Sequence, residues 1–441
     1  MTDRTRWIII GAGSAGCVFA NRLSADPSND VVLLDDGPGL EPAAVPTAIS
    51  GPSFFEAMAE PGRLHVDLLA TRAVGIEPEL YQRGRGVGGS SAVNAMVALR
   101  GDPELYRSWG WHDADEAWSR VQIPTTTAHP DQIGAIDRAL RTHDLGRAAD
   151  MTRLDGHRVT SAEAYLWPVL NRPNLTVAPN HEVDTITFVD RSATGVRLRD
   201  GTELAADRVL VCAGAIHSPT VLLRSGVDTP GVGAELQDHP SAVFTLQLRD
   251  EIPQDRAGLP VASVLHQVVN GNVLQLLPLS HLGPAPESAG LGALMAAVMT
   301  PVGRAGSVTI DVAGRPIIDF ALLDDERDVA ALVDAVDLAL EVITSSAFTD
   351  ICSAAYVDDR GTTIDALSSN EAIADWVRGS CGDYVHATST CAMGRVVDDN
   401  GSVYGYEHLF VGDASVFPHI PDANTHLPTT MLAERLAMRL R

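Results

Sequence analysis

Basic residues are scarce in this sequence. Its 441 residues contain 32 lysines and arginines against 57 aspartates and glutamates, so the net charge at pH 7 is -25. A surface with this balance repels phosphate groups, whereas nucleic-acid and anionic-membrane binding need basic patches. The composition therefore argues against nucleic acid and anionic lipid as partners.

Cysteine is also rare, and the five cysteines are scattered through positions 17, 212, 352, 381 and 391. They are odd in number and never form a C-x-x-C pair. Disulfide frameworks and zinc sites need paired or closely spaced cysteines, so this spacing argues against both. We therefore expect a protein of the reducing cytosol with no metal site.

Long apolar runs are missing as well. Trp7–Ile10 has only four apolar residues before the first glycine, which is too short for the core of a signal peptide. A later apolar run near Leu291–Met299 is too short to cross a bilayer. The sequence predicts a soluble, cytoplasmic protein without an integral membrane segment.

The first forty residues have the pattern of a nucleotide-binding unit, in which WIIIGAGSAGCVFANRLSADPSNDVVLLDDGPG reads as strand, glycine turn, helix and strand. Gly11, Gly13 and Gly16 form G-x-G-x-x-G, and Asp35 ends the second strand. Such glycines permit the turn, the approach of a pyrophosphate to the helix N-terminus and close helix packing, while the acid binds a ribose. The unit predicts a dinucleotide other than NADP, because Asp35 would repel a 2′-phosphate. It fits NAD and FAD equally.

Three later segments have the pattern of further cofactor scaffold. Residues 83–101, RGRGVGGSSAVNAMVALRG, form a glycine-rich loop whose backbone N–H groups could bind a second phosphate or a ring. Residues 207–227 predict a buried strand, a turn and a short helix, and residues 408–440 predict a strand, a loop and a terminal helix. Asp413 follows that last strand, where ligands meet parallel sheets, although a helix cap or turn acid would also stand there.

The middle of the chain has a different pattern. Between residues 241 and 320, runs such as AVFTLQL, SVLHQVV and NVLQLLPL predict antiparallel strands, and DDERDVAALVDAVDLALEVITS predicts a helix. Residues 112–160 are weakly patterned. A chain of this length is expected to form two lobes, so we assign these strands to a second lobe whose sheet lies over the cofactor.

Five ordered segments resemble the landmarks of one enzyme family. GRGVGGSSAVN followed by RG, GAIHSPTVLLRSG, GVGAELQDHP, VHATSTCAMG and VGDASVFPHIPDANTHLPTTMLAERLA are similar, in order and spacing, to those of the glucose-methanol-choline (GMC) oxidoreductases. These are FAD-dependent enzymes that oxidise alcohols. The resemblance runs from residue 7 to the terminal helix and is weakest in the middle lobe and in residues 112–160.

The resemblance implies an α/β fold in which two discontinuous domains are interleaved. A Rossmann-like FAD-binding domain would comprise residues 1–100, 170–240 and 376–441. A substrate domain, built on an antiparallel sheet plus helices, would comprise residues 101–169 and 241–375.

The resemblance also implies which residues hold FAD. Those expected at its ADP half are Gly11, Gly13, Ser14, Gly16 and Asp35. Those expected elsewhere are Gly88, Gly89, Ser90 and Asn94 at the flavin, Val183 at the adenine, and Asp413 with Ala414 at the pyrophosphate–ribityl region.

His386, in DYVHATSTCAMG, has small and apolar neighbours and no second ligand at a metal-binding spacing. A lone histidine of this kind is more often a hydrogen-bonded core residue. The resemblance implies instead that His386 is the family's catalytic histidine and that His426, in ANTHLP, is its partner, at a position where the family uses His or Asn. A neutral imidazole could take the hydroxyl proton of an alcohol while flavin N5 takes the hydride.

The sequence also departs from the family pattern. Where some members carry a histidine bonded covalently to FAD, this chain has Val93, so the cofactor should be non-covalent. Arg107 replaces the polar or acidic residue that usually closes the first family signature, and Asp36 stands where a small residue is common. We expect neither to contact the reacting groups. The chain is shorter than most members, mainly after Trp111, which predicts a less enclosed flavin.

Two other enzyme classes explain the sequence less well. A serine hydrolase would need a G-x-S-x-G elbow, which the sequence lacks, and an NAD dehydrogenase would leave residues 83–101 and 408–434 without a role. A flavin module that only transfers electrons, and an FAD-dependent lyase or isomerase, are the alternatives.

The electron acceptor is a separate question. Small apolar Val385 permits dioxygen, whereas the reduced enclosure of the flavin makes room for a quinone or another carrier. We slightly favour a dehydrogenase of a primary alcohol over an oxidase.

Overall fold

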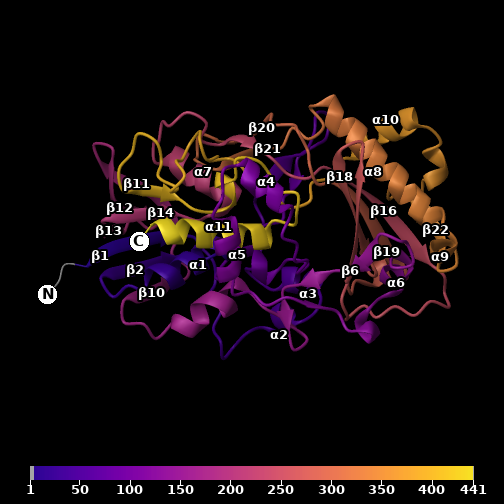
Figure 1. Ribbon diagram of the computed structural model, residues 1–441, viewed down its shortest axis with the longest axis horizontal. Coiled ribbons are helices and arrows are strands. Elements are labelled where there is room, and N and C mark those ends of the chain that lie inside the picture. Colours follow the sequence, from indigo (N-terminus) through magenta and orange to yellow (C-terminus); the bar gives the residue numbers. More distant parts are fainter. Residues whose placement is uncertain (1–3, 441) are drawn as a thin grey trace.

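The computed structural model describes residues 4–440, and the chain is mixed α/β (Figure 1). A parallel sheet lies towards one end of the long axis and an antiparallel sheet towards the other (Figure 1). All five cysteines lie within the described residues, where they are buried and unpaired. Across residues 4–440, no helix combines the length and the apolar character that crossing a membrane would require.

Within the described residues, five parallel strands form the first sheet in the order β10-β2-β1-β14-β23. Their bounds are β1 Thr5–Ile10, β2 Asn29–Leu34, β10 Leu175–Ala178, β14 Arg208–Val211 and β23 Leu409–Val411. The last four residues of β1 and β2 are all buried, as expected for strands covered on both faces. Helices α1 (Ser14–Leu23) and α11 (His426–Arg439) pack against each other and share one core with this sheet.

The antiparallel sheet is made, in the described part of the chain, of six strands in the order β22-β16-β19-β18-β17-β6. Their bounds are β6 Gly146–Ala148, β16 Ser241–Leu248, β17 Ser263–Val269, β18 Asn272–Leu279, β19 Leu291–Val298 and β22 Cys352–Tyr356. Helix α8 (Glu326–Thr344) packs on β16, β18 and β19, and α10 (Asn370–Ser380) packs on α8 (Figure 1). The weakly patterned residues 112–160 supply the edge strand β6.

Two smaller sheets join segments that are distant in the sequence. One, in the order β15-β20-β21-β3-β4, consists of Ala234–Leu236, Gly306–Ile310, Pro316–Asp319, Leu69–Thr71 and Glu79–Leu80. The other, in the order β11-β12-β13, consists of Val183–Val189, Ser192–Leu198 and Glu203–Ala205. The pairing of β21 with β3 is parallel and connects the N-terminal part of the chain to the middle. Residues 306–310 lie in the range 241–320 where antiparallel strands were expected, and they belong to this sheet and not to the six-stranded one.

The remaining elements are short. The helices are α2 Thr47–Ser50, α3 Phe54–Ala59, α4 Pro103–Ser108, α5 Ala114–Arg120, α6 Ala135–Leu140, α7 Gly214–Arg224 and α9 Ser346–Thr349. The strands are β5 Thr126–Thr127 with β7 Asp150–Met151, and β8 Arg153–Leu154 with β9 His157–Arg158. Two 3₁₀ turns matter for the site, η1 Gly89–Ala92 and η7 Ala414–Val416.

Candidate active site

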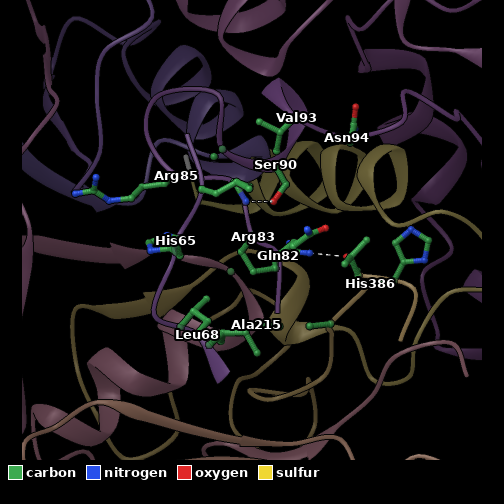
Figure 2. A pocket seen from close by; sticks show the side chains of 18 of the residues that line it. His65, Leu68, Gln82, Arg83, Arg85, Ser90, Val93, Asn94, Ala215 and His386 are labelled. Carbon is green, nitrogen blue, oxygen red and sulfur yellow. Dashed lines mark hydrogen bonds between the residues drawn. The ribbon is translucent and has the colours of Figure 1, made fainter. Parts of the chain in front are cut away.

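A cavity of about 1320 Å³ lies between the carboxyl ends of the parallel strands and the antiparallel sheet. At the first sheet it is lined by Gly11 and Asp35, and at the second by Leu277 and Met295. His386 also lines it. Figure 2 shows Asn94 and His386 on one side of the pocket and His65 and Arg85 on the other. In open α/β sheets ligands bind at the carboxyl ends of the strands, so this cavity is the candidate active site.

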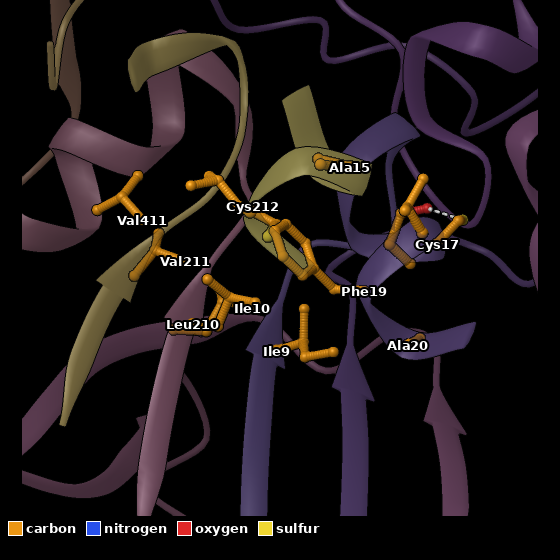
Figure 3. Packing of buried hydrophobic residues seen from close by; sticks show 14 of the residues in the cluster. Ile9, Ile10, Ala15, Cys17, Phe19, Ala20, Leu210, Val211, Cys212 and Val411 are labelled. Carbon is orange, nitrogen blue, oxygen red and sulfur yellow. Dashed lines mark hydrogen bonds between the residues drawn. The ribbon is translucent and has the colours of Figure 1, made fainter. Parts of the chain in front are cut away.

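The glycine turn after β1 is shaped by close backbone contacts. A Cβ on Gly11 would stand 2.5 Å from the Cys212 carbonyl oxygen, and one on Gly16 would stand 1.9 Å from the Gly11 carbonyl oxygen. At Gly13, by contrast, the nearest atom would be 3.9 Å away. Phe19 of α1 packs among the side chains of β1 and β14 (Figure 3), which holds the helix against the sheet. The N-terminal N–H groups of α1 therefore face the cavity, as a bound pyrophosphate requires.

Asp35 ties the end of β2 to this turn. Its Oδ2 accepts a hydrogen bond from the Ala12 N–H at 2.7 Å, and its Oδ1 accepts one from the Gly37 N–H at 2.9 Å. Burial raises the pKa of the Asp35 carboxyl to about 6, against these donors, which act to lower it. The side chain lines the cavity, so its remaining lone pairs can accept bonds from a ribose.

The second glycine loop lies directly against the first. The Gly88 N–H donates to the Ala12 carbonyl oxygen at 2.8 Å, and a Cβ on Gly89 would stand 2.7 Å from the Gly13 Cα. Gly88 and Gly89 have φ angles of +98° and +52°, which favour glycine. The Ser90 hydroxyl accepts from the Gly84 N–H at 3.1 Å (Figure 2). Two separate glycine-rich segments thus form one continuous wall of main chain.

Three other predicted cofactor residues also line this cavity. Val183 is the first residue of β11, and its carbonyl oxygen accepts from Arg224 at 3.0 Å. Asp413 caps η7, with Oδ1 accepting from the Ser415 N–H and Oδ2 accepting from the Gly214 N–H, both at 2.8 Å. Ala414 follows it. Asp413 is therefore a turn cap and a cavity residue at the same time.

His386 is 9% exposed and is held by contacts on both sides of its ring. Its Nδ1 lies 3.0 Å from Nδ1 of His239, and its Nε2 lies 3.4 Å from the Asn424 amide nitrogen. Its backbone N–H donates to Asp238 Oδ2 at 2.8 Å. Burial, followed by His239 and Arg83, lowers the pKa of the His386 imidazole well below its usual value. The ring is therefore neutral at physiological pH, so one of its two nitrogens carries a lone pair.

His426 has different partners. Its Nδ1 accepts from the Asn94 amide nitrogen at 3.4 Å, and its Nε2 donates to the Ser161 hydroxyl at 3.1 Å. Burial, with a smaller effect of Arg158, lowers the pKa of His426 to about 4. His426 is the partner of His386 expected from the sequence; both residues line the cavity, and the residue of ANTHLP within hydrogen-bonding distance of His386 is Asn424.

Sequence reasoning missed several residues around His386. The landmark GVGAELQDHP supplies Asp238 and His239, but nothing in its spacing places them beside a loop that comes about 150 residues later. Arg158 lies in the weakly patterned segment, and its guanidinium donates to Asn94 Oδ1 at 2.8 Å. The order of the family landmarks along the sequence was the only indication of the site, and an order does not say which side chains contact one another.

Apolar side chains form the wall of the cavity at the antiparallel sheet. Leu277 and Leu279 come from β18, Met295 from β19 and Val243 from β16. Phe54 and Phe55, whose rings stack 4.2 Å apart, line the cavity near the loop that follows β18. This end of the cavity favours an apolar, uncharged group.

Asp238, His239 and His386 also form a cluster whose possible ligand atoms lie within 4.8 Å of one another. The Asp238 carboxylate, however, accepts the backbone N–H groups of His239, Tyr384 and His386, and the Tyr81 hydroxyl. Its lone pairs are therefore used, and we interpret the cluster as a hydrogen-bond network.

Two family models, both described as GMC oxidoreductase, match the chain. The N-terminal model matches residues 5–129 and 132–241, and the C-terminal model matches residues 301–433. Together they cover most of the chain and all five strands of the parallel sheet, and they leave unmatched residues 242–300, which contain β17, β18, β19 and most of β16 of the antiparallel sheet.

Curated relatives match over nearly the whole chain. A 5-(hydroxymethyl)furfural oxidase from Methylovorus sp. (strain MP688) is 30% identical, with 99% of each chain covered. An oxygen-dependent choline dehydrogenase from Burkholderia pseudomallei is 28% identical, with 99% of this chain and 93% of the relative covered. The first alignment has 540 positions against 441 residues here, so this chain is the shorter of the two.

Solved structures share the fold. Pyridoxine 4-oxidase from Mesorbium loti superposes with a TM-score of 0.87 at 24% identity, covering 99% of both chains. An FAD-dependent oxidoreductase from Chaetomium thermophilum superposes with a TM-score of 0.82 at 18% identity, covering 98% of both chains.

Proposed function

The chain belongs to the GMC oxidoreductases, and from this premise we propose that it uses FAD to oxidise a primary alcohol to its aldehyde. One observation supports the proposal above the others. A single cavity connects the two glycine loops, which suit a pyrophosphate, with His386 and Asn424, which suit a hydroxyl group. A binding module would need only the first of these ends.

The residues proposed to hold FAD all line this cavity or lie in the loops that form it. They are Gly11, Gly13, Ser14, Gly16, Asp35, Gly88, Gly89, Ser90, Asn94, Val183, Asp413 and Ala414. The N-terminus of helix α1 fits the pyrophosphate of a dinucleotide, and the glycine at position 89, where a Cβ would stand 2.7 Å from the Gly13 Cα, lets the second loop pack against the first. We propose non-covalent binding, because Val93 has no nucleophilic atom. When bound, FAD would supply the hydride acceptor.

We further propose the division into domains expected from the sequence. Residues 1–100, 170–240 and 376–441 would form the FAD-binding, Rossmann-like domain. Residues 101–169 and 241–375 would form the substrate domain, whose antiparallel sheet provides the apolar wall.

In this proposal His386 and Asn424 act on the alcohol oxygen. The neutral His386 ring takes the hydroxyl proton at Nε2, and the Asn424 amide donates a hydrogen bond to the same oxygen. The partner role that the sequence suggested for His426 passes to Asn424. His426 would instead orient the Asn94 side chain, whose Oδ1 is held by Arg158 and whose amide nitrogen donates to His426.

The substrate proposed here is uncharged and largely apolar. Leu277, Leu279 and Met295 offer it no charged partner, and Phe54 and Phe55 add aromatic surface. The Methylovorus relative is named for a furan alcohol and the Burkholderia relative for choline, a quaternary ammonium alcohol. The apolar wall favours a substrate of the first kind.

The electron acceptor is a separate part of the proposal. Val385, beside His386, lines the cavity and is 41% exposed, which leaves room for an organic acceptor and favours a dehydrogenase. The names of the relatives, an oxidase and an oxygen-dependent dehydrogenase, favour dioxygen as the second candidate. Stopped-flow reoxidation separates them. Reoxidation by air-saturated buffer as fast as turnover with a dye would make the protein an oxidase.

An anaerobic screen of primary alcohols, with the flavin absorption band as readout, tests the whole proposal. We expect apolar and aromatic alcohols to bleach the flavin, and His386→Ala to keep its flavin while the reduction slows at least ~100-fold. Flavin that is reduced by dithionite but by no alcohol would indicate an electron-transfer module instead. Product formed without flavin reduction would indicate a lyase or isomerase. Acid denaturation should release intact FAD, and flavin that precipitates with the chain would contradict non-covalent binding.

A further inference from the structure

His239 is fully buried beside His386, and its contacts define where its proton lies. Its Nε2 lies 3.0 Å from the Pro421 carbonyl oxygen, which can only accept a hydrogen bond. Nε2 must therefore carry hydrogen. Burial lowers the pKa of His239 to about 3, so the ring holds one proton in all. Its Nδ1 is consequently a lone pair.

The same reasoning extends to His386. Its Nδ1 lies 3.0 Å from the Nδ1 lone pair of His239, with the two rings nearly perpendicular at 87°. Two lone pairs at this distance would repel each other, so the hydrogen lies on Nδ1 of His386. The other ring nitrogen, Nε2, is then unprotonated and accepts from the Asn424 amide at 3.4 Å. Each hydrogen bond in this series, from the Pro421 carbonyl through the two histidine rings to the Asn424 amide, then has one donor and one acceptor.

The neighbouring acid does not perform this task. Asp238 directs its carboxylate to the backbone N–H groups of His239, Tyr384 and His386 and to the Tyr81 hydroxyl. It holds the loop that contains His386, in which Val385 has a φ of +56°. In a Ser-His-Asp triad a carboxylate selects the histidine tautomer. Here a neutral imidazole is in the corresponding place.

We propose that His239 is a positioning residue that holds His386 in the Nδ1–H tautomer, leaving Nε2 free to take a proton from the substrate. Without the His239 acceptor, His386 divides between its two tautomers, and the Nε2–H form cannot act as a base. The kinetic consequence rests on the proposed function, whereas the tautomer itself does not.

Two substitutions separate this role from a packing role. The Asn side chain places an oxygen near the position of histidine Nδ1, so His239→Asn keeps an acceptor for His386 and loses the bond to Pro421. The Gln side chain places its amide nitrogen near the position of Nε2, so His239→Gln keeps the bond to Pro421 and loses the acceptor. If His239 selects the tautomer, His239→Gln should slow flavin reduction by about 10- to 100-fold at unchanged KM. His239→Asn should lose less. A residue needed only to anchor the loop at Pro421 gives the reverse order, which overturns the proposal.

The direct measurement is long-range ¹H–¹⁵N correlation NMR of the flavin-loaded protein with labelled histidine. The His386 signals are identified by their loss in His386→Ala. We expect a protonated Nδ1 and an unprotonated Nε2 in the wild type and in His239→Asn, and a mixture in His239→Gln. A wild-type His386 protonated at Nε2, or a tautomer that His239→Gln leaves unchanged, overturns the proposal. The wild-type tautomer is read without any His239 variant and without oxidation of an alcohol, so its result is independent of the proposed function.

Discussion

The two ends of the cavity are built from different materials. Main chain forms the end at the parallel sheet, where the turns containing Gly11–Gly16 and Gly88–Gly89 touch each other and Asp35 and Asp413 are bonded to amides. Side chains form the end at the antiparallel sheet, where Leu277 and Met295 face the cavity. A wall of main chain has strict steric limits, whereas a wall of side chains can be varied with the strands kept in place. Changes at the first end should therefore affect folding and cofactor retention, and changes at the second should affect the alcohol.

We expect the largest difference between the two ends of the cavity when a methyl group is added in the first glycine turn. Gly16→Ala places Cβ 1.9 Å from the Gly11 carbonyl oxygen, so we expect the free energy of unfolding to fall by about 3 kcal/mol or more. We expect this variant to lose its flavin as well. Gly13→Ala, in the same motif, has 3.9 Å of free space and should lower flavin retention with little effect on folding. Denaturant unfolding and flavin content measure the two effects. Equal stability of the two variants would contradict this account of the turn.

The residues at the middle of the cavity belong to neither wall, and we expect the next largest effects from substitutions there. Asn424→Ala removes the amide beside His386 Nε2, so alcohol-driven flavin reduction should slow by about 10- to 100-fold with flavin retained. His426→Ala should cost less, because His426 contacts Asn94 and Ser161 instead. Anaerobic stopped-flow reduction of both variants is the measurement. A larger loss in His426→Ala would return the partner role to His426.

The buried histidines should also make stability depend on pH. Burial lowers the folded-state pKa of His426 to about 4, against about 6.5 in the unfolded chain. Below pH 6.5 the unfolded chain takes up a proton that the folded one does not, so this contribution is present above pH 6.5 and declines as the pH falls towards 4. The stability lost through this shift amounts to about 2 kcal/mol by pH 5. His426→Asn should therefore lose less stability than the wild type between about pH 7 and pH 5, measured by urea unfolding. The same loss in both proteins would contradict the assigned shift.

The smallest effect is expected at the side-chain wall. Met295→Gln keeps the length of the side chain and makes it polar, so kcat/KM for an apolar alcohol should fall by about 10-fold, with flavin content unchanged. Met295→Leu is the matched control and should stay close to the wild type. Steady-state kinetics with an apolar and a polyhydroxylated alcohol measure the change. A loss of flavin in Met295→Gln would place this residue at the cofactor end instead.

Much of the fold was readable because its signals are local. The apolar strand of residues 7–10, the glycine turn and Asp35 lie within forty residues, and the structure has β1, α1 and β2 there. The alternating runs AVFTLQL, SVLHQVV and NVLQLLPL predicted antiparallel strands, which are β16, β17 and β18. Edge strands such as β6 and the pairing of β21 with β3 could not be predicted, because strands of three or four residues are too short to have a detectable periodicity.

The candidate site divides in the same way. Backbone geometry restricts a glycine turn to few residue types, so the sequence alone indicates where a pyrophosphate can bind and which two loops contain histidines near the C-terminus. Which groups meet His386 is a matter of packing, since Asn424 and His426 are two residues apart and equally compatible with the ANTHLP turn. The contact of His239 with His386 joins positions 147 residues apart, through a loop held by Asp238. No local pattern encodes that contact, because a side chain's hydrogen-bond partner depends on the final position of both backbones to within a few tenths of an ångström.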